Sequence, residues 1–192
     1  GFKYGTGWMP EMRILQDGDK LEVGDYEFTC IQTPGHTQGH TCLWEANRGI
    51  FVAGDHVLYD ITPNIQCWSE DDNPLGDYLS SLDKVRGLEV ALALPGHRSL
   101  FTDFRGRIDG LKRHHANRLA EVEQILAASS PMHAFDTASQ MTWDLSTKNW
   151  DEFPVAQKWF ATGEAIAHLR YLEAENRIRR ARQDPVIMYE PA

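Results

Sequence analysis

Apolar and polar positions alternate in short runs along the first third of the chain, which is the pattern of half-buried β-strands. One pair of runs is separated by Gly24-Asp25 and a second pair by Asn47-Arg48-Gly49. Short β-prone runs on either side of such turn residues predict antiparallel hairpins. The expected strands cover residues 20–23, 26–32, 41–46 and 49–53. Residues 55–68 are expected to form a loop.

The middle of the chain changes to helical spacing. Asn73-Pro74 is typical of a helix start, because Pro is favoured in the first helical turn. Leucines and other apolar residues then recur at helical spacing as far as Val85. A short apolar run at 90–94 predicts a buried strand, and residues 104–128 predict a long amphipathic helix. This alternation of strands and helices predicts an α/β layer sandwich.

A boundary is expected at Ser129-Ser130-Pro131, which divides the chain into domains of residues 1–130 and 131–192. Beyond it the pattern predicts a helix, a longer helix and a hairpin, at residues 135–141, 155–176 and 178–189, the last with its turn at 183–185. This order is typical of a small winged-helix-like α+β domain. The longer helix has no excess of basic residues, so we expect a lid, a dimer contact or a clamp for single-stranded RNA rather than a DNA reader.

Composition narrows the class of protein. The 192 residues are 42% hydrophobic and 24% charged, as in ordinary globular proteins. No apolar run approaches the roughly 20 residues of a membrane helix, and no apolar signal segment opens the chain, so we expect a cytoplasmic protein without a membrane partner. The net charge of −9 argues against a general nucleic-acid surface. Cys30, Cys42 and Cys67 lack CxxC spacing and are expected to be reduced thiols.

A shared theme occurs at three places: an apolar run, a Gly, and then a potential metal ligand. The stretches are TPGHTQGH at 33–40, VAGDH at 52–56 and LPGH at 94–97. A strand that ends in Gly delivers the next side chain from a tight turn at the sheet edge. We therefore expect His36, Asp55 and His97 to converge. Imidazole and carboxylate together suit zinc, and also manganese or iron.

These motifs resemble those of the metallo-β-lactamase fold hydrolases, in the branch of glyoxalase II and the β-lactamase-like endoribonucleases. The stretches GDHVLYDITPN, DNPLGDYLSSL and HHANRLAEVEQIL extend the resemblance over most of the chain. The resemblance implies an αββα sandwich that binds two zinc ions. It assigns Asp55 as the bridging ligand and His97 as a ligand of the second metal, with a metal-bound hydroxide as the nucleophile and no side-chain base.

The first motif of that family, HxHxDH, has no match in this sequence. The resemblance therefore covers only the second half of the catalytic domain, followed by the winged-helix-like domain. We expect the isolated chain to be inactive, and to form a homo-oligomer or to associate with a missing N-terminal half. Metal occupancy of this part alone is expected to be partial or absent.

Further polar residues are candidates for supporting roles. For His40 we expect hydrogen bonds that hold the loop or a ligand. His56 either faces the pocket or is a solvated loop residue. On the long helix, we prefer a substrate contact for His114 or His115, and Arg118 either pairs with an anionic substrate group or lies on a solvated face. The loop residues Tyr59, Thr62, Asn64 and Trp68 either shape the pocket or are simply packed.

The sequence thus predicts a zinc-dependent hydrolase of an ester, thioester, lactone or phosphodiester. Its partner would be a small ester- or thioester-like substrate, with RNA as a further option. The alternative is a nucleic-acid-binding or regulatory winged-helix module with a vestigial metal site.

Overall fold

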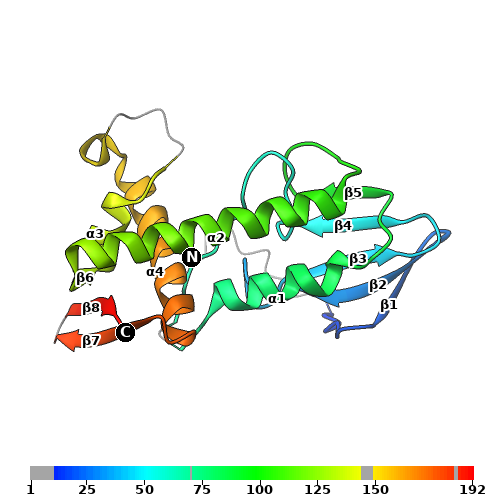
Figure 1. The fold of residues 1–192 in the computed structure, drawn as a ribbon. Helices are drawn as coiled ribbons and strands as arrows, with labels where there is room; N and C mark the ends of the chain where they lie inside the picture. The colour runs from blue at the N-terminus through cyan, green and yellow to red at the C-terminus, as the bar shows by residue number, and fades with distance from the viewer. Residues whose placement is uncertain (1–10, 70, 144–148, 184–185) are drawn as a thin grey trace, which may run out of the picture.

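A computed structural model shows a mainly antiparallel sheet at one end of the molecule and helices that extend away from it (Figure 1). The structure describes residues 11–69, 71–143, 149–183 and 186–192. The first sheet has the strand order β1-β2-β3-β4-β5. Its strands are β1 (Lys20–Val23), β2 (Tyr26–Gln32), β3 (Thr41–Glu45), β4 (Ile50–Gly54) and β5 (Leu92–Pro95). The predicted hairpins and the fifth strand are confirmed, although only Ala93 of the fifth strand is fully buried.

The pairing of β4 with β5 is parallel, whereas the other pairs are antiparallel. Parallel neighbours need a crossover connection, and here helix α1 (Pro74–Arg86) supplies it. Its N-cap is Asn73, whose side chain accepts a hydrogen bond from the Gly76 N–H at 3.2 Å. Because β4 and β5 run the same way, the residues that follow them emerge at the same edge of the sheet.

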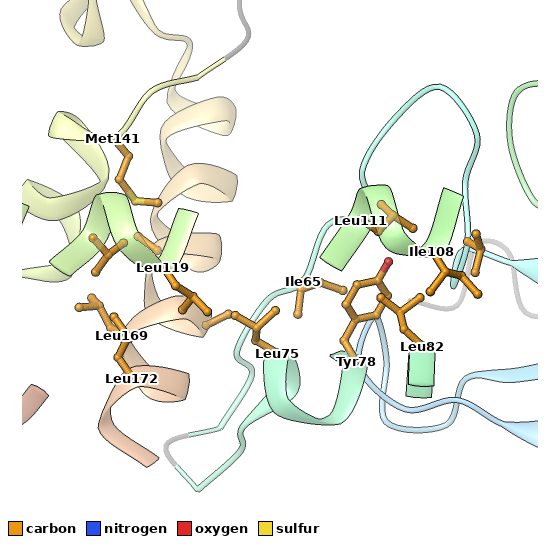
Figure 2. Packing of buried hydrophobic residues seen from close by; sticks show 14 of the residues in the cluster. Ile65, Leu75, Tyr78, Leu82, Ile108, Leu111, Leu119, Met141, Leu169 and Leu172 are labelled. Carbon is orange, nitrogen blue, oxygen red and sulfur yellow. The ribbon is translucent and has the colours of Figure 1, made fainter. Parts of the chain in front are cut away.

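Helix α2 (Phe104–Ser129) lies beside α1, and both cover one face of the sheet (Figure 1). The ring of Phe51 on β4 packs 4.7 Å from that of Phe104. Figure 2 shows Tyr78 and Leu82 of α1 directed toward Ile108 and Leu111 of α2. These side chains are fully buried and form the centre of the core.

The opposite face of the sheet is also apolar but remains partly exposed. Strand register places one set of side chains on this outer face. Most of its apolar members are only partly buried: Leu21, Phe28, Leu43, Ile50, Val52, Leu92 and Leu94. On the same face Val23 and Tyr26 are exposed, whereas Cys30 is fully buried. None of them belongs to the core cluster of the described residues. A sheet with apolar side chains on both faces is built to be covered on both.

The C-terminal part carries a second sheet, with the order β6-β8-β7. Its elements are β6 (Met132–His133), α3 (Ala134–Gln140), a 3₁₀ turn at Trp150–Glu152, α4 (Val155–Ala174), β7 (Ile178–Gln183) and β8 (Val186–Pro191). The two predicted helices and the hairpin are present, whereas β6 was missed because two residues give no periodicity. Positions 184–185 of the predicted turn, like 1–10 of the N-terminal segment, lie outside the described residues.

Helix α2 reaches from the first sheet to the second (Figure 1). Its last turns carry Leu119, Val122 and Leu126, which are buried in the same cluster as Leu169 and Leu172 of α4 (Figure 2). The winged-helix assignment and the boundary at residue 130 stay predictions. Within the described part of the chain, no helix is both long and apolar enough to cross a membrane.

Candidate metal centre

Asp55 lies between two histidines at the edge of the first sheet. Oδ2 of Asp55 is 3.5 Å from Nε2 of His36, and Oδ1 is 3.5 Å from Nε2 of His97. Asp55 follows β4 and His97 follows β5, while His36 comes from the loop after β2. The structure therefore brings together the three residues expected to converge.

Two glycines allow this close approach. Gly35 has φ +140°, and a Cβ on it would come within 2.5–2.8 Å of the Cβ, Cα and N atoms of Tyr78. A Cβ on Gly96 would lie 2.7 Å from Oδ1 of Asp55. At Gly35 the contact is with the backbone and Cβ of Tyr78, so packing requires a glycine before His36. At Gly96 an added Cβ would instead push against the Asp55 carboxylate and displace it.

The ring of His36 is oriented by a hydrogen bond on its far side. Nδ1 of His36 is 2.8 Å from the carbonyl oxygen of Asn64. Because a carbonyl oxygen can only accept, Nδ1 carries a proton, and Nε2 is the ring nitrogen that faces Asp55. A metal-binding imidazole is held in the same way, with one nitrogen hydrogen-bonded to the protein and the other left for the metal.

His40 contributes to the same centre by binding the backbone of Asp55. Its Nε2 accepts a hydrogen bond from the backbone N–H of Asp55 at 3.1 Å, so its Nδ1 is the protonated nitrogen, 2.8 Å from Oγ1 of Thr33. Burial, together with the nearby His36, lowers the pKa of His40. A neutral His40 can keep the acceptor that holds Asp55 in place.

The spacing of these atoms fits a tetrahedral metal ion. Two ligand atoms at about 2.0–2.2 Å from one zinc ion lie about 3.4 Å apart. The two N···O separations of 3.5 Å match this value. Across the described residues, no three His, Cys, Asp or Glu side chains form a ready-made site for a single ion. Instead, Asp55 offers two possible ligand pairs, one made of Oδ2 and His36 and the other of Oδ1 and His97.

The loop after Asp55 contributes in other ways than we expected. His56 is fully buried, so the solvated alternative is wrong; burial and His40 lower its pKa to about 3. The centroid of its ring lies 6.0 Å from that of His40 and 5.3 Å from that of Tyr78.

Two further loop residues have other roles. Tyr59 is exposed and stacks on Phe101, with 5.3 Å between the ring centroids. Asn64 acts through its backbone carbonyl rather than its side chain.

The residues predicted on the long helix do not contact the metal-centre residues. His115 is buried, with Nδ1 at 3.2 Å from Nε2 of His168, a partner that sequence reasoning missed. Burial excludes a direct substrate contact for His115, whereas the half-buried His114 lines a cleft. His168 gave no signal in the sequence because only tertiary packing brings α4 against α2.

Arg118 is buried rather than solvated, and its guanidinium already has protein partners. Its guanidinium lies 3.0 Å from a carboxylate oxygen of Glu121 and 3.5 Å from one of Glu164. It also donates to the carbonyl of Thr142 and lies over the ring of Trp143 at 4.2 Å. Burial raises the pKa of Glu164 even with Arg118 beside it. Arg118 thus fixes the contact between α2, α4 and the segment after α3.

A cleft of about 1070 Å³ opens beside this arginine. One wall is the Asp60–Thr62 part of the loop that follows Asp55, and the others come from α2, α4 and the residues Thr142, Trp143 and Phe153 between α3 and α4. Asp60, Glu121 and Glu164 line it with Arg118, so acidic groups outnumber basic ones. The loop whose Asn64 carbonyl binds the His36 ring therefore also forms part of the cleft wall.

Comparisons with known proteins agree with this geometry. Residues 11–97 match the family model described as the metallo-beta-lactamase superfamily, and residues 119–192 match that described as the metallo-beta-lactamase-like C-terminal domain. A beta-lactamase domain protein from Burkholderia ambifaria is 32% identical, with a TM-score of 0.86 over 96% of this chain and 53% of its own. These matches support membership of the metallo-beta-lactamase superfamily. A family protein from Thermus thermophilus is 31% identical, with a TM-score of 0.76 over 93% of this chain and 54% of its own.

Curated members of this superfamily are named as hydrolases. Human acyl-coenzyme A thioesterase MBLAC2 is 37% identical over 93 residues, which are 46% of this chain and 32% of the human protein. The probable metallo-hydrolase YqjP of Bacillus subtilis is 26% identical over 159 residues, 79% of this chain and 46% of that protein. The chain thus spans between a third and about half of these relatives. Their names support hydrolase activity in the family.

Proposed function

We propose that this chain forms part of a metal-dependent hydrolase, with zinc as the preferred metal. The observation that carries the proposal is the Asp55 carboxylate, which presents one oxygen to His36 and the other to His97 at equal distances of 3.5 Å. A carboxylate placed in this way can bridge two cations. When bound, such ions would lower the pKa of a water molecule and polarise the bond to be broken.

The protein's own groups hold these ligands in place. The carbonyl of Asn64 fixes the His36 ring, and His40 fixes the backbone of Asp55. His97 is the most exposed of the set, with 65% of its side chain accessible. We propose that substrate enters on the side of His97, because His36 and Asp55 are more than two-thirds buried.

Among esters, thioesters, lactones and phosphodiesters, we propose a thioester substrate. The support is the printed name of the human relative, an acyl-coenzyme A thioesterase.

The outer face of the sheet supports a proposal about the missing partner. Exposed, contiguous apolar surface of this kind marks a protein contact. We propose that a second sheet covers this face in the working enzyme, and that it belongs to the half of the longer relatives that this chain does not match. The remaining metal ligands would come from that half, and the isolated chain would be inactive. Self-association through the same face is the alternative.

The nucleic-acid alternative has less support. Arg177, just before the basic strand β7, pairs with Glu123, and on β7 Arg179 pairs with Glu190 and Arg180 with Glu173. Basic side chains engaged in this way are poorly placed to bind phosphates. An affinity for RNA that falls steeply with salt would restore this alternative.

Thioester hydrolysis under controlled metal supply tests the proposal. Native mass spectrometry first measures the mass of the protein purified from its natural source. Hydrolysis of a short-chain acyl thioester is then measured after a chelator has removed bound metal, and again after zinc is added. We expect a mass above 21.9 kDa, activity that depends on zinc, and a loss of at least about 10³-fold in His36→Ala. Gln38→Ala on the same loop is the matched control. Zinc-independent activity, or activity unchanged by His36→Ala, would overturn the proposal.

A further inference from the structure

A second pocket lies in the C-terminal part of the molecule, and none of the metal-centre residues lines it. Its volume is about 360 Å³, at the lower end of the roughly 300–1,000 Å³ of small-molecule sites. Strand β8, helix α4 and the segment before α1 enclose it. The apolar wall consists of Trp68, Ile166, Val186 and Ile187. A wall of this kind suits an aliphatic chain.

The same pocket has a cationic corner. Arg170 lines it, and only 16% of its side chain is exposed. One end of its guanidinium donates to Glu173, whereas its buried Nε has no hydrogen-bond partner among the described residues. Because Nε itself is inaccessible, a ligand in the pocket would meet the accessible remainder of the Arg170 side chain, whose positive charge favours a charge-assisted hydrogen bond with an anionic acceptor.

Tyr189 adds a hydroxyl close to this arginine. Burial raises the pKa of Tyr189 to about 12, so the phenol remains protonated and can donate a hydrogen bond at neutral pH. Tyr189, Arg170 and Arg180 line the same pocket, and Glu173 forms ion pairs with both arginines. A guanidinium and a phenol that converge in an apolar pocket form a receptor for a carboxylate.

We propose that this pocket binds an aliphatic carboxylate of medium chain length. Its head group accepts hydrogen bonds from Arg170 and Tyr189, and its chain packs against Ile166, Val186 and Ile187. The site is separate from the metal centre, so its occupancy does not depend on the proposed hydrolase activity.

Cys67 provides a built-in reporter of occupancy. Its thiol lines the pocket and is partly exposed, whereas Cys30 and Cys42 are completely buried. The pKa of Cys67 is raised by burial, and the hydrogen bond to the Ser69 carbonyl and the charge of Arg170 only partly offset this shift. Alkylation of Cys67 by a maleimide is therefore expected to slow when a ligand fills the pocket.

The experiment measures the rate of Cys67 alkylation by peptide mass spectrometry with increasing octanoate, and in parallel with octan-1-ol. We expect saturable protection by octanoate and at least about tenfold weaker protection by the alcohol, which is ~1.4 kcal/mol. The zinc-site variant His36→Ala is expected to behave as wild type, which separates this site from the metal centre. Equal protection by the two compounds, or no protection, would overturn the proposal.

Variants locate the head group. Each is compared with its own ligand-free rate, because Arg170 itself influences the thiol. We expect Arg170→Met to weaken octanoate protection about tenfold and Tyr189→Phe, which preserves the shape, about threefold. Arg179→Met is the control, because Arg179 pairs with Glu190 on the exposed surface. Folded Arg170→Met and Tyr189→Phe proteins with unchanged protection would contradict the assignment.

Discussion

The ring of His40 accepts a hydrogen bond from the backbone N–H of Asp55 at 3.1 Å. This contact fixes the strand end that presents the carboxylate. We expect His40→Ala to lower the zinc affinity by about 10–100-fold, as is usual when a group that orients a ligand is lost. Competition with a chromophoric chelator measures it. Gln38→Ala, on the same loop, is the control, and a folded His40→Ala protein with wild-type zinc affinity would contradict the role.

Gly35 and Gly39 form a matched pair on the same loop. We expect Gly35→Ala to reduce the free energy of unfolding by about 2–4 kcal/mol, because of its positive φ and the contact with Tyr78. Gly39 has open space around its missing Cβ, so Gly39→Ala is expected to be nearly neutral. Urea denaturation of the two variants measures the difference. Equal stabilities would show that the loop adapts to a side chain at residue 35.

Arg118 is a structural residue in this geometry. We expect Arg118→Met to cost about 3–5 kcal/mol of stability, because two partly buried carboxylates lose their partner. Arg113→Met, on an exposed part of the same helix, is expected to stay within about 0.5 kcal/mol of wild type. Thermal unfolding compares them. A stable Arg118→Met protein with a raised KM for an anionic substrate would instead favour the substrate-binding interpretation.

The buried pair of His115 and His168 makes stability depend on pH. Burial lowers the pKa of both, to about 4 for His168 and well below the usual value for His115, with His114 and Arg118 adding to the effect. The unfolded chain therefore binds more protons below about pH 6.5, and stability is fully present above that pH and falls as the pH drops. Each histidine is expected to contribute a loss of about 2 kcal/mol between pH 7 and pH 5.

Urea denaturation at several pH values tests this dependence. We expect His168→Gln to make the decline between pH 7 and pH 5 shallower by about one proton. Asn117→Ala, an exposed and non-titrating neighbour on α2, should keep the wild-type slope. An unchanged slope in His168→Gln would mean that another group dominates the acid sensitivity.

The sequence predicted the elements well, because turn residues and periodicity are local signals. The Gly-ligand theme also predicted that His36, Asp55 and His97 would meet, since parallel strands end at one sheet edge. Their metal-binding roles stay predictions. The contact of Thr33 with His40 is short-range in the sequence. The contacts of Asn64 with His36 and of His168 with His115 were harder to predict, because their partners lie far apart in the chain.

Burial was the main property that the sequence could not supply. His56 and Arg118 were both candidates for polar surfaces, yet both are buried. A charged or polar residue on a helix or loop gives no sign of which neighbours cover it. The carboxylates of Glu121 and Glu164 that stabilise Arg118 could only be found in three dimensions.

Helix α2 has a consequence for how the chain can be divided. Its 26 residues belong to both ends of the molecule, and the family model for the C-terminal domain begins inside it, at residue 119. Leu119, Val122 and Leu126 lose the apolar side chains of α4 that they pack against once α4 is removed. A fragment of residues 1–130 would end at the predicted domain boundary, but the apolar side chains at the end of α2 would be exposed to solvent. Two modules that look separable along the chain are thus expected to unfold together.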